Sequence, residues 1–244
     1  MSEHRDYEQL VFRPVTDDLA EFKDLAAAAK DAGFTHIYIS ALLGLTDFQG
    51  DDAESPWCAW SARLPSVFKH ATPPGLEDAF PADFVRKQMD FMKAKHELVA
   101  ELGLRAAYYG NEPHWLSERV YARHPRWRGA RCDNSLRTVG MFFSPNVDHA
   151  GVREAYRAAV KEIVSQCPLL DVFSLVAGDS GSGYIWSEWL YVNPNGPSGY
   201  EGRDMGKRVV GFLECIRDAA AEAGASDPRV FTMDHYFSRE ERVL

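Results

Sequence analysis

Two acidic side chains, Asp179 and Glu188, lie where an α/β enzyme would place a reacting carboxylate. Residues 172–177 are an apolar run that predicts a buried strand, and Asp179 follows it among glycines. Glu188 comes nine residues later, between Trp186 and Trp189. Glycosidases use two carboxylates, one as acid and the other as base or nucleophile. Asp179 is therefore the first catalytic candidate and Glu188 its partner, with a turn-forming aspartate and a solvated glutamate as the alternatives.

The loop after residues 104–109, the third predicted strand, carries another set of polar and aromatic side chains. Glu112 is an alternative partner carboxylate, and His114 could bind a hydroxyl or move a proton. Trp115 has a flat apolar face of the kind that stacks on a sugar ring. The alternative for Glu112 is a solvated acid, and that for His114 is a polar loop residue. The alternative for Trp115 is a side chain that fixes the loop to the domain.

Further substrate-binding candidates follow the last two predicted strands. Trp186 is a candidate for stacking on a sugar. Asp234 and His235 come directly after the strand predicted over 230–233, so we expect them at the same edge of the sheet as the other candidates. The chain has no His-Glu-x-x-His or comparable ligand set, so no metal site is predicted. No cofactor is expected either, because two carboxylates suffice for glycoside hydrolysis.

The elements that would position these residues alternate along the chain. Apolar runs predict strands over residues 10–13, 36–40, 104–109, 172–177 and 230–233, with a short extended piece over 141–145. Apolar residues at helical spacing predict helices between Asp18 and Gly33 and over residues 83–102, 148–165 and 205–223.

Strands that alternate with long helices predict an α/β fold with a parallel sheet and right-handed crossovers. An open doubly wound sheet is one such fold. A (β/α) barrel of the TIM type fits better, because long loops follow nearly every strand and would share one face. A complete barrel has eight strands, whereas this chain has about five β/α units. We therefore expect residues 1–244 to form a single, partial barrel domain that is incomplete at its C-terminus.

Composition and charge argue against several classes of partner. The formal net charge is −9 and the isoelectric point is about 5.4, whereas nucleic acid and anionic membranes need basic surfaces. No apolar run approaches the length of a membrane span. The N-terminus is polar, unlike a signal peptide, and the four cysteines form no Cys-x-x-Cys pair. We expect a cytoplasmic protein with reduced cysteines.

Three short sequence motifs occur in a characteristic order. Residues 124–129 (His-Pro-Arg-Trp-Arg-Gly) follow the third strand, residues 143–146 (Phe-Ser-Pro-Asn) precede the next long helix, and residues 177–180 (Ala-Gly-Asp-Ser) end the fourth strand. This order resembles the catalytic barrel of family 20 glycoside hydrolases, the β-hexosaminidase type. In that family, Tyr-Pro-Glu, Cys-Pro-Ser and Gly-Gly-Asp-Glu motifs occupy the corresponding positions. The order of elements is also similar, more loosely, to that of α-glucuronidase-type barrels.

The resemblance implies a glycoside or oligosaccharide substrate and a sugar-binding role for Arg13 in the first strand. Asp179 matches the family's aspartate that orients the acetamido group, but Ser180 stands where the family has its general-acid glutamate. Glu188 would then take the acid role, or the substrate is a different sugar, or the protein does not hydrolyse at all. A non-catalytic carbohydrate-binding or degenerate barrel is therefore the second hypothesis.

A third hypothesis is an esterase, because residues 178–180 (Gly-Asp-Ser) are similar to the start of the GDSL esterases, with Ser180 as the nucleophile. An unclosed barrel would also expose two strand edges and apolar inner faces. Self-association through these edges is therefore expected.

Overall fold

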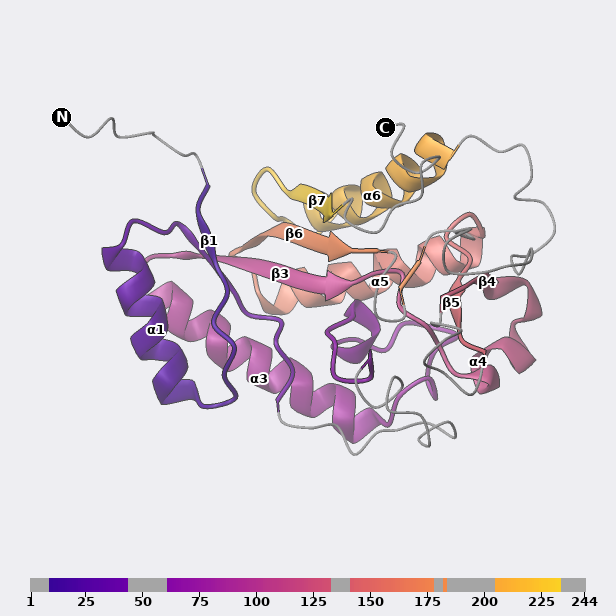
Figure 1. The fold of residues 1–244 in the computed structure, drawn as a ribbon, viewed down its shortest axis with the longest axis horizontal. Coiled ribbons are helices and arrows are strands. Elements are labelled where there is room, and N and C mark those ends of the chain that lie inside the picture. The colour runs from indigo at the N-terminus through magenta and orange to yellow at the C-terminus, as the bar shows by residue number, and fades with distance from the viewer. Residues whose placement is uncertain (1–8, 44–60, 133–140, 178–181, 184–204, 234–244) are drawn as a thin grey trace.

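A sheet of five parallel strands forms the centre of the molecule, and neighbouring strands follow the order of the sequence (Figure 1). The computed structural model describes residues 9–43, 61–132, 141–177, 182–183 and 205–233. The five strands are β1 (Val11–Phe12), β2 (His36–Tyr38), β3 (Arg105–Asn111), β6 (Leu170–Val176) and β7 (Arg229–Met233). The predicted parallel α/β sheet is thus confirmed.

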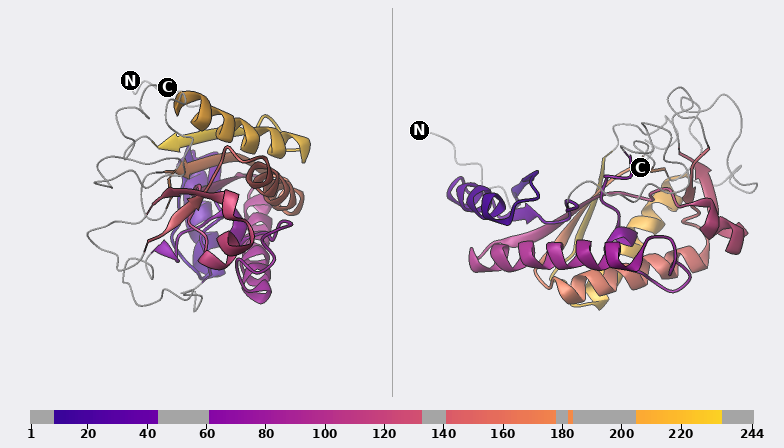
Figure 2. Two further views of the ribbon diagram at one scale, coloured as in Figure 1. Left: turned by 90° about the vertical axis from the view of Figure 1, so that its right-hand side faces the viewer. Right: turned by 90° about the horizontal axis from the view of Figure 1, so that it is seen from below.

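Four long helices pack against one face of this sheet and share a single hydrophobic core with it (Figure 2). They are α1 (Leu19–Asp31), α3 (Ala82–Glu101), α5 (Ala150–Gln166) and α6 (Met205–Glu222). A doubly wound sheet would carry helices on both faces. In the described part of the chain the long helices lie on one face, so the doubly wound alternative is wrong for these elements.

The pairing of the strands separates their residues into two faces. Tyr108, Phe173 and Val230 are register partners that point into the core beneath the helices. The next row, Tyr109, Ser174 and Phe231, points to the opposite side, because successive strand residues alternate between faces. We call that opposite side the open face. Both rows contain aromatic side chains, but the row on the open face lies outside the main hydrophobic core and includes the hydroxyl of Ser174.

A small second sheet follows β3, and the sequence pattern did not predict it. Helix α4 (Glu118–Arg123) and the 3₁₀ turn η2 (Pro125–Trp127) lead into β4 (Arg128–Arg131). Strand β4 pairs antiparallel with β5 (Phe143–Pro145), which falls in the predicted extended piece. The Arg-Gly-Ala-Arg sequence of β4 has no apolar alternation, so its strand conformation depends on this pairing.

No helix in the described part of the chain is long and apolar enough to cross a membrane.

The junction of β4 and β5 leaves no room for a side chain at Gly129. A Cβ atom there would lie 2.5 Å from the carbonyl oxygen of Ser144 and 2.8 Å from the backbone nitrogen of Asn146. Because these neighbours are backbone atoms, the sheet itself would have to shift. We expect Gly129→Ala to lower the free energy of unfolding by about 1–3 kcal/mol, measured by chemical denaturation.

Gly211→Ala is the matched control. Gly211 lies within α6, and the nearest atom to an added Cβ is Nη2 of Arg153 at 3.1 Å, the end of a flexible side chain. Alanine also favours the helix by roughly 0.5–1 kcal/mol. This variant should match or exceed the parent in stability. Equal losses in the two variants would contradict the assignment of strain to the β4–β5 junction.

Candidate functional site

A carboxyl group, Glu112, is completely buried at the C-terminal end of β3. Its Oε1 accepts a hydrogen bond from the backbone nitrogen of Val67 at 2.6 Å. Its Oε2 accepts from the Tyr156 hydroxyl at 2.8 Å and from the backbone nitrogen of His114 at 3.2 Å. Burial raises the pKa of Glu112 to about 7, and these hydrogen bonds partly oppose the rise.

The partners of Glu112 show which elements it holds together. Val67 begins the 3₁₀ turn η1 (Val67–Lys69), and Tyr156 lies on α5, so both are on the helix side of the sheet. Both carboxyl oxygens are engaged, and the side chain has no exposed surface. This geometry is that of a residue that positions the strand end, and a catalytic role for Glu112 stays a prediction.

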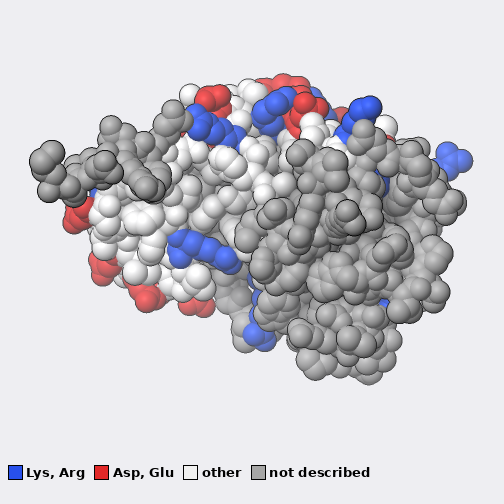
Figure 3. Space-filling view, turned by 45° about the horizontal axis from the view of Figure 1, so that its top comes forward, with Lys and Arg blue, Asp and Glu red and all other residues white. Residues whose placement is uncertain are grey.

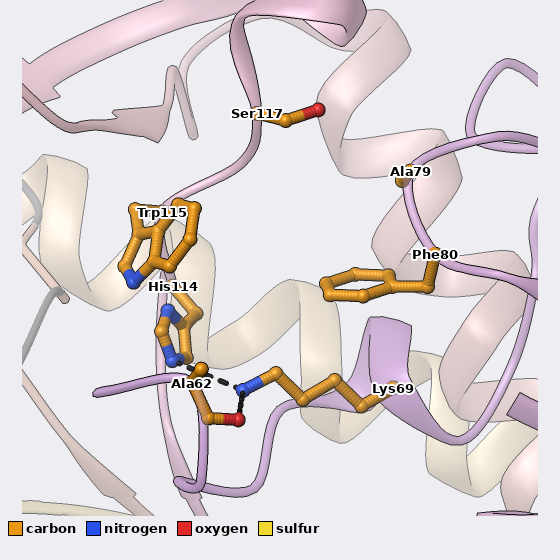
Figure 4. A pocket seen from close by; sticks show the side chains of 7 residues that line it. All are labelled: Ala62, Lys69, Ala79, Phe80, His114, Trp115 and Ser117. Atoms are coloured by element: carbon orange, nitrogen blue, oxygen red, sulfur yellow. Dashed lines mark hydrogen bonds between the residues drawn. The ribbon is translucent and has the colours of Figure 1, made fainter. Parts of the chain in front are cut away.

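Lys69 is a second buried ionisable group beside the same loop. Its Nζ donates to the carbonyl oxygen of Ala62 at 2.8 Å and lies 3.4 Å from Nε2 of His114 (Figure 4). It also donates to the carbonyl oxygen of Leu64 at 2.6 Å. Burial lowers the pKa of Lys69 to about 7, and the charge of Glu112 opposes that fall. The ammonium group thereby fixes residues 61–64 against η1. No sequence pattern marked Lys69, because its role depends on carbonyls of an irregular segment.

His114 is neutral in this environment. Burial and the charge of Lys69 lower the pKa of His114 well below its ordinary value. Its Nε2 lies 3.0 Å from the carbonyl oxygen of Ser61. The tautomer that carries its proton on Nε2 satisfies that carbonyl and leaves a lone pair on Nδ1, for which the described part of the chain supplies no hydrogen-bond partner.

His114 and Trp115 line a cavity too small for a sugar. The cavity volume is about 10 Å³, room for about one water molecule. Trp115 Nε1 donates to the Ser61 hydroxyl at 2.9 Å, and its ring packs against Phe142 with centroids 5.0 Å apart. Both side chains are buried by other protein atoms. The sugar contacts predicted for His114 and Trp115 stay predictions. The cavity is lined by Ala62, Lys69, Ala79, Phe80, His114, Trp115 and Ser117.

Arg13 lies on the open face, as expected of a residue that follows β1. Its guanidinium carbon is 3.6 Å from the centroid of the Tyr109 ring, a cation–π stacking distance. The Tyr38 ring meets the same tyrosine edge-on, with centroids 5.8 Å apart. The Tyr38 hydroxyl reaches Ser174 Oγ at 2.6 Å. We call Arg13, Tyr38, Tyr109 and Ser174 the sheet-face cluster.

The sheet-face cluster is held by its backbone and remains open to solvent. Ser40 Oγ donates to the carbonyl of Tyr109 at 2.7 Å and accepts from its nitrogen at 2.8 Å. Arg13 is exposed, and the other three members are half-buried. Burial raises the pKa of Tyr38, which the Ser174 hydrogen bond and the Arg13 charge partly offset. Its phenol is therefore a neutral hydroxyl near neutral pH. The sequence predicted a binding role for Arg13 but none for the tyrosines, whose alternation within β2 and β3 was the available signal.

The surface in Figure 3 carries its charges unevenly. In this view Asp and Glu side chains lie along the margins of the described surface, and a Lys or Arg side chain lies within the otherwise uncharged part between them.

The segment after β6 is joined to the Glu112 loop. Ser182 forms an antiparallel bridge with His114, and its hydroxyl donates to the carbonyl of Val176 at 2.9 Å. The backbone nitrogen of Gly183 donates to the carbonyl of Pro113 at 3.1 Å. Glu112 thus fixes the loop against which this segment rests. The remaining candidates, Asp179, Ser180, Trp186, Glu188, Asp234 and His235, lie outside the described residues.

Within the described ranges, no group of three or more His, Cys, Asp or Glu side chains could hold a metal ion.

No protein-family model matches the chain, and no curated protein matches it. Among solved structures, the fold is similar to that of an α-galactosidase from Lactobacillus brevis, with a TM-score of 0.46 and 12% sequence identity. The match covers 93% of this chain and 26% of that one, so the chain spans about a quarter of the length of that enzyme.

The burial of Glu112 predicts how stability depends on pH. Its pKa is about 7 in the folded protein against 4.5 in an exposed carboxyl. Between these values the unfolded chain has lost a proton that the folded protein keeps, so this group's contribution to stability falls as pH rises. In Glu112→Gln we expect a smaller loss of thermal stability between pH 5 and about 6.5 than in the parent, measured by thermal unfolding.

The quantity to compare is the slope of the melting temperature against pH. The absolute melting temperature is not suitable, because the amide cannot accept every hydrogen bond of the carboxylate and will lower stability at all pH values. Asp90→Asn, an exposed change on α3, is the control and should keep the parental slope. Parallel slopes for the parent and Glu112→Gln would show that Glu112 does not titrate in this range.

Proposed function

We propose that this chain is part of a glycoside hydrolase-like (β/α) barrel that binds a glycoside or oligosaccharide at the C-terminal edge of its sheet. One observation carries the proposal: the parallel strands follow chain order, with the long helices on one face. In a (β/α) barrel the opposite face is the interior, and the loops after the strands form the active site. The open face and the end of β6 correspond to those two places.

The residues on the open face suit a carbohydrate. A sugar presents hydroxyls on its edges and weakly polar C–H faces, so aromatic rings beside hydroxyl and guanidinium groups complement it. Tyr38, Tyr109 and Ser174 offer these groups together with Arg13. This arrangement supports sugar binding next to the strand ends.

The chemistry proposed is acid/base catalysis by two carboxylates. Asp179 comes two positions after Ala177, the residue that directly follows β6, and Glu188 is the proposed partner. A separation of about 5–5.5 Å between the carboxyls would give retention of the anomeric configuration, and about 6.5–9.5 Å would give inversion. Glu112 would position the loop of residues 113–115 that pairs with Ser182. Acid/base catalysis by two carboxylates requires no cofactor.

The test is turnover of nitrophenyl α- and β-glycosides by the parent protein and by Asp179→Asn. Loss of the carboxylate should lower kcat/KM for an accepted glycoside by about 10²–10⁴-fold, the range for general acid or base catalysis. Asp24→Asn, an exposed change on α1, is the control and should match the parent. Full turnover by Asp179→Asn would remove this residue from the mechanism.

A non-catalytic carbohydrate-binding protein is the second candidate. It is favoured by Glu112, whose two carboxyl oxygens are occupied by protein donors instead of facing solvent. Ser180 at the expected acid position favours it as well. Saturable binding of an oligosaccharide with no release of product would support this candidate over the hydrolase.

A further inference from the structure

Among the described residues, the Arg13 guanidinium has no hydrogen-bond or ion-pair partner at its N–H edges. The guanidinium lies over the Tyr109 ring, with 3.6 Å between its carbon and the ring centroid. Stacking uses the flat face of the group and leaves its N–H donors pointing outward in the plane. Tyr109 is itself fixed by the two Ser40 hydrogen bonds and by the edge of Tyr38. The guanidinium group of Arg13 is therefore oriented before any ligand binds.

Arg13 has no acidic partner among the residues that the structure describes. Arg105, which lies two strands away on the open face, differs in this respect because it forms an ion pair with Asp171. Arg208 on α6 likewise pairs with Asp148. The sheet-face cluster thus presents a positive charge that is stacked but not neutralised by these residues.

Two hydroxyl groups extend the donor set next to this charge. Tyr38 and Ser174 lie 2.6 Å apart, so one of the two protons is used between them and the other can be donated to a ligand. The Arg13 guanidinium stacks on the Tyr109 ring, and the Tyr38 ring meets that same ring edge-on with centroids 5.8 Å apart, so the guanidinium and the hydroxyl pair belong to one cluster. A guanidinium fork with an adjacent hydroxyl donor matches an oxyanion.

We infer that the sheet-face cluster binds the acidic group of a sugar, so that the ligand of this protein is an acidic glycoside. The inference rests on the proposed carbohydrate function and adds the substrate class to it. The net charge of −9 would repel an anion at long range, but at physiological ionic strength such fields are screened beyond about 8 Å. Contact with Arg13 then decides which sugar is preferred.

The experiment is a ligand-observed NMR titration of the full chain with three methyl or free sugars. Methyl β-D-glucuronide carries a carboxylate, methyl β-D-glucoside is its neutral counterpart, and glucose 6-sulfate carries a tetrahedral anion. We expect the glucuronide or the sulfate to bind about tenfold or more tightly than the glucoside. Which of the two anions binds better identifies the acidic group.

Arg13→Gln should remove this preference while leaving the weaker binding of the glucoside within about twofold. Arg13→Lys keeps the charge but loses the planar fork, and should recover only part of the preference. Arg126→Gln makes the same change in net charge at an exposed position on η2 and should bind all three sugars as the parent does. Retained glucoside binding also reports that the Arg13 variants are folded.

Each outcome has a distinct meaning. Equal binding of the acidic and neutral sugars overturns the inference and leaves the carbohydrate function standing. A preference for the acidic sugar that survives in Arg13→Gln overturns the assignment to this cluster. Binding of none of the three sugars overturns the inference, and if larger oligosaccharides also fail to bind, the proposed function falls with it.

Discussion

The arrangement of this protein depends on one constraint, the packing of every long described helix on a single face of a parallel sheet. Strands β1, β2, β3, β6 and β7 lie in chain order, and right-handed crossovers between such neighbours return to the same side each time. The apolar rows of the sheet, such as Tyr108 and Phe173, are therefore buried together with the helices in one core. The opposite rows lie on the open face, away from this core, and they carry the hydroxyls, rings and guanidinium of the sheet-face cluster.

The strand ends are fixed by buried ionisable groups, which are costly to place in a protein interior. Glu112 and Lys69 are each buried, and the pKa of each is moved to about 7 from opposite directions. Their hydrogen bonds, to Val67 and Tyr156 on one side and to the carbonyls of residues 62 and 64 on the other, compensate for lost hydration. In return, irregular segments at the C-terminal edge acquire defined positions, and loops there carry the candidate chemistry.

Much of the fold could be predicted from the sequence, because periodicity is a local property. The apolar spacing after Asp18 predicted α1, in which Phe22, Ala26 and Ala29 are buried. Strand β4 could not be predicted, since Arg128-Gly129-Ala130-Arg131 becomes a strand only by pairing with β5. The surroundings of Glu112 were also out of reach. An acidic residue after a predicted strand is a candidate by its type, but two of the donors that cover Glu112 come from positions 67 and 156, far away in the sequence.

The sheet-face cluster shows how a small residue can be as important as the polar ones beside it. Tyr38 and Ser174 belong to strands on either side of β3, and Ala107 is the β3 residue paired with Tyr38. A methyl side chain at that position lets the tyrosine lie across the middle strand and reach the serine hydroxyl at 2.6 Å. A larger side chain at Ala107 would fill the path between them and separate the phenol from its partner. The position of the hydroxyl pair beside Arg13 therefore follows from side-chain size on the open face, combined with the register that aligns β2, β3 and β6.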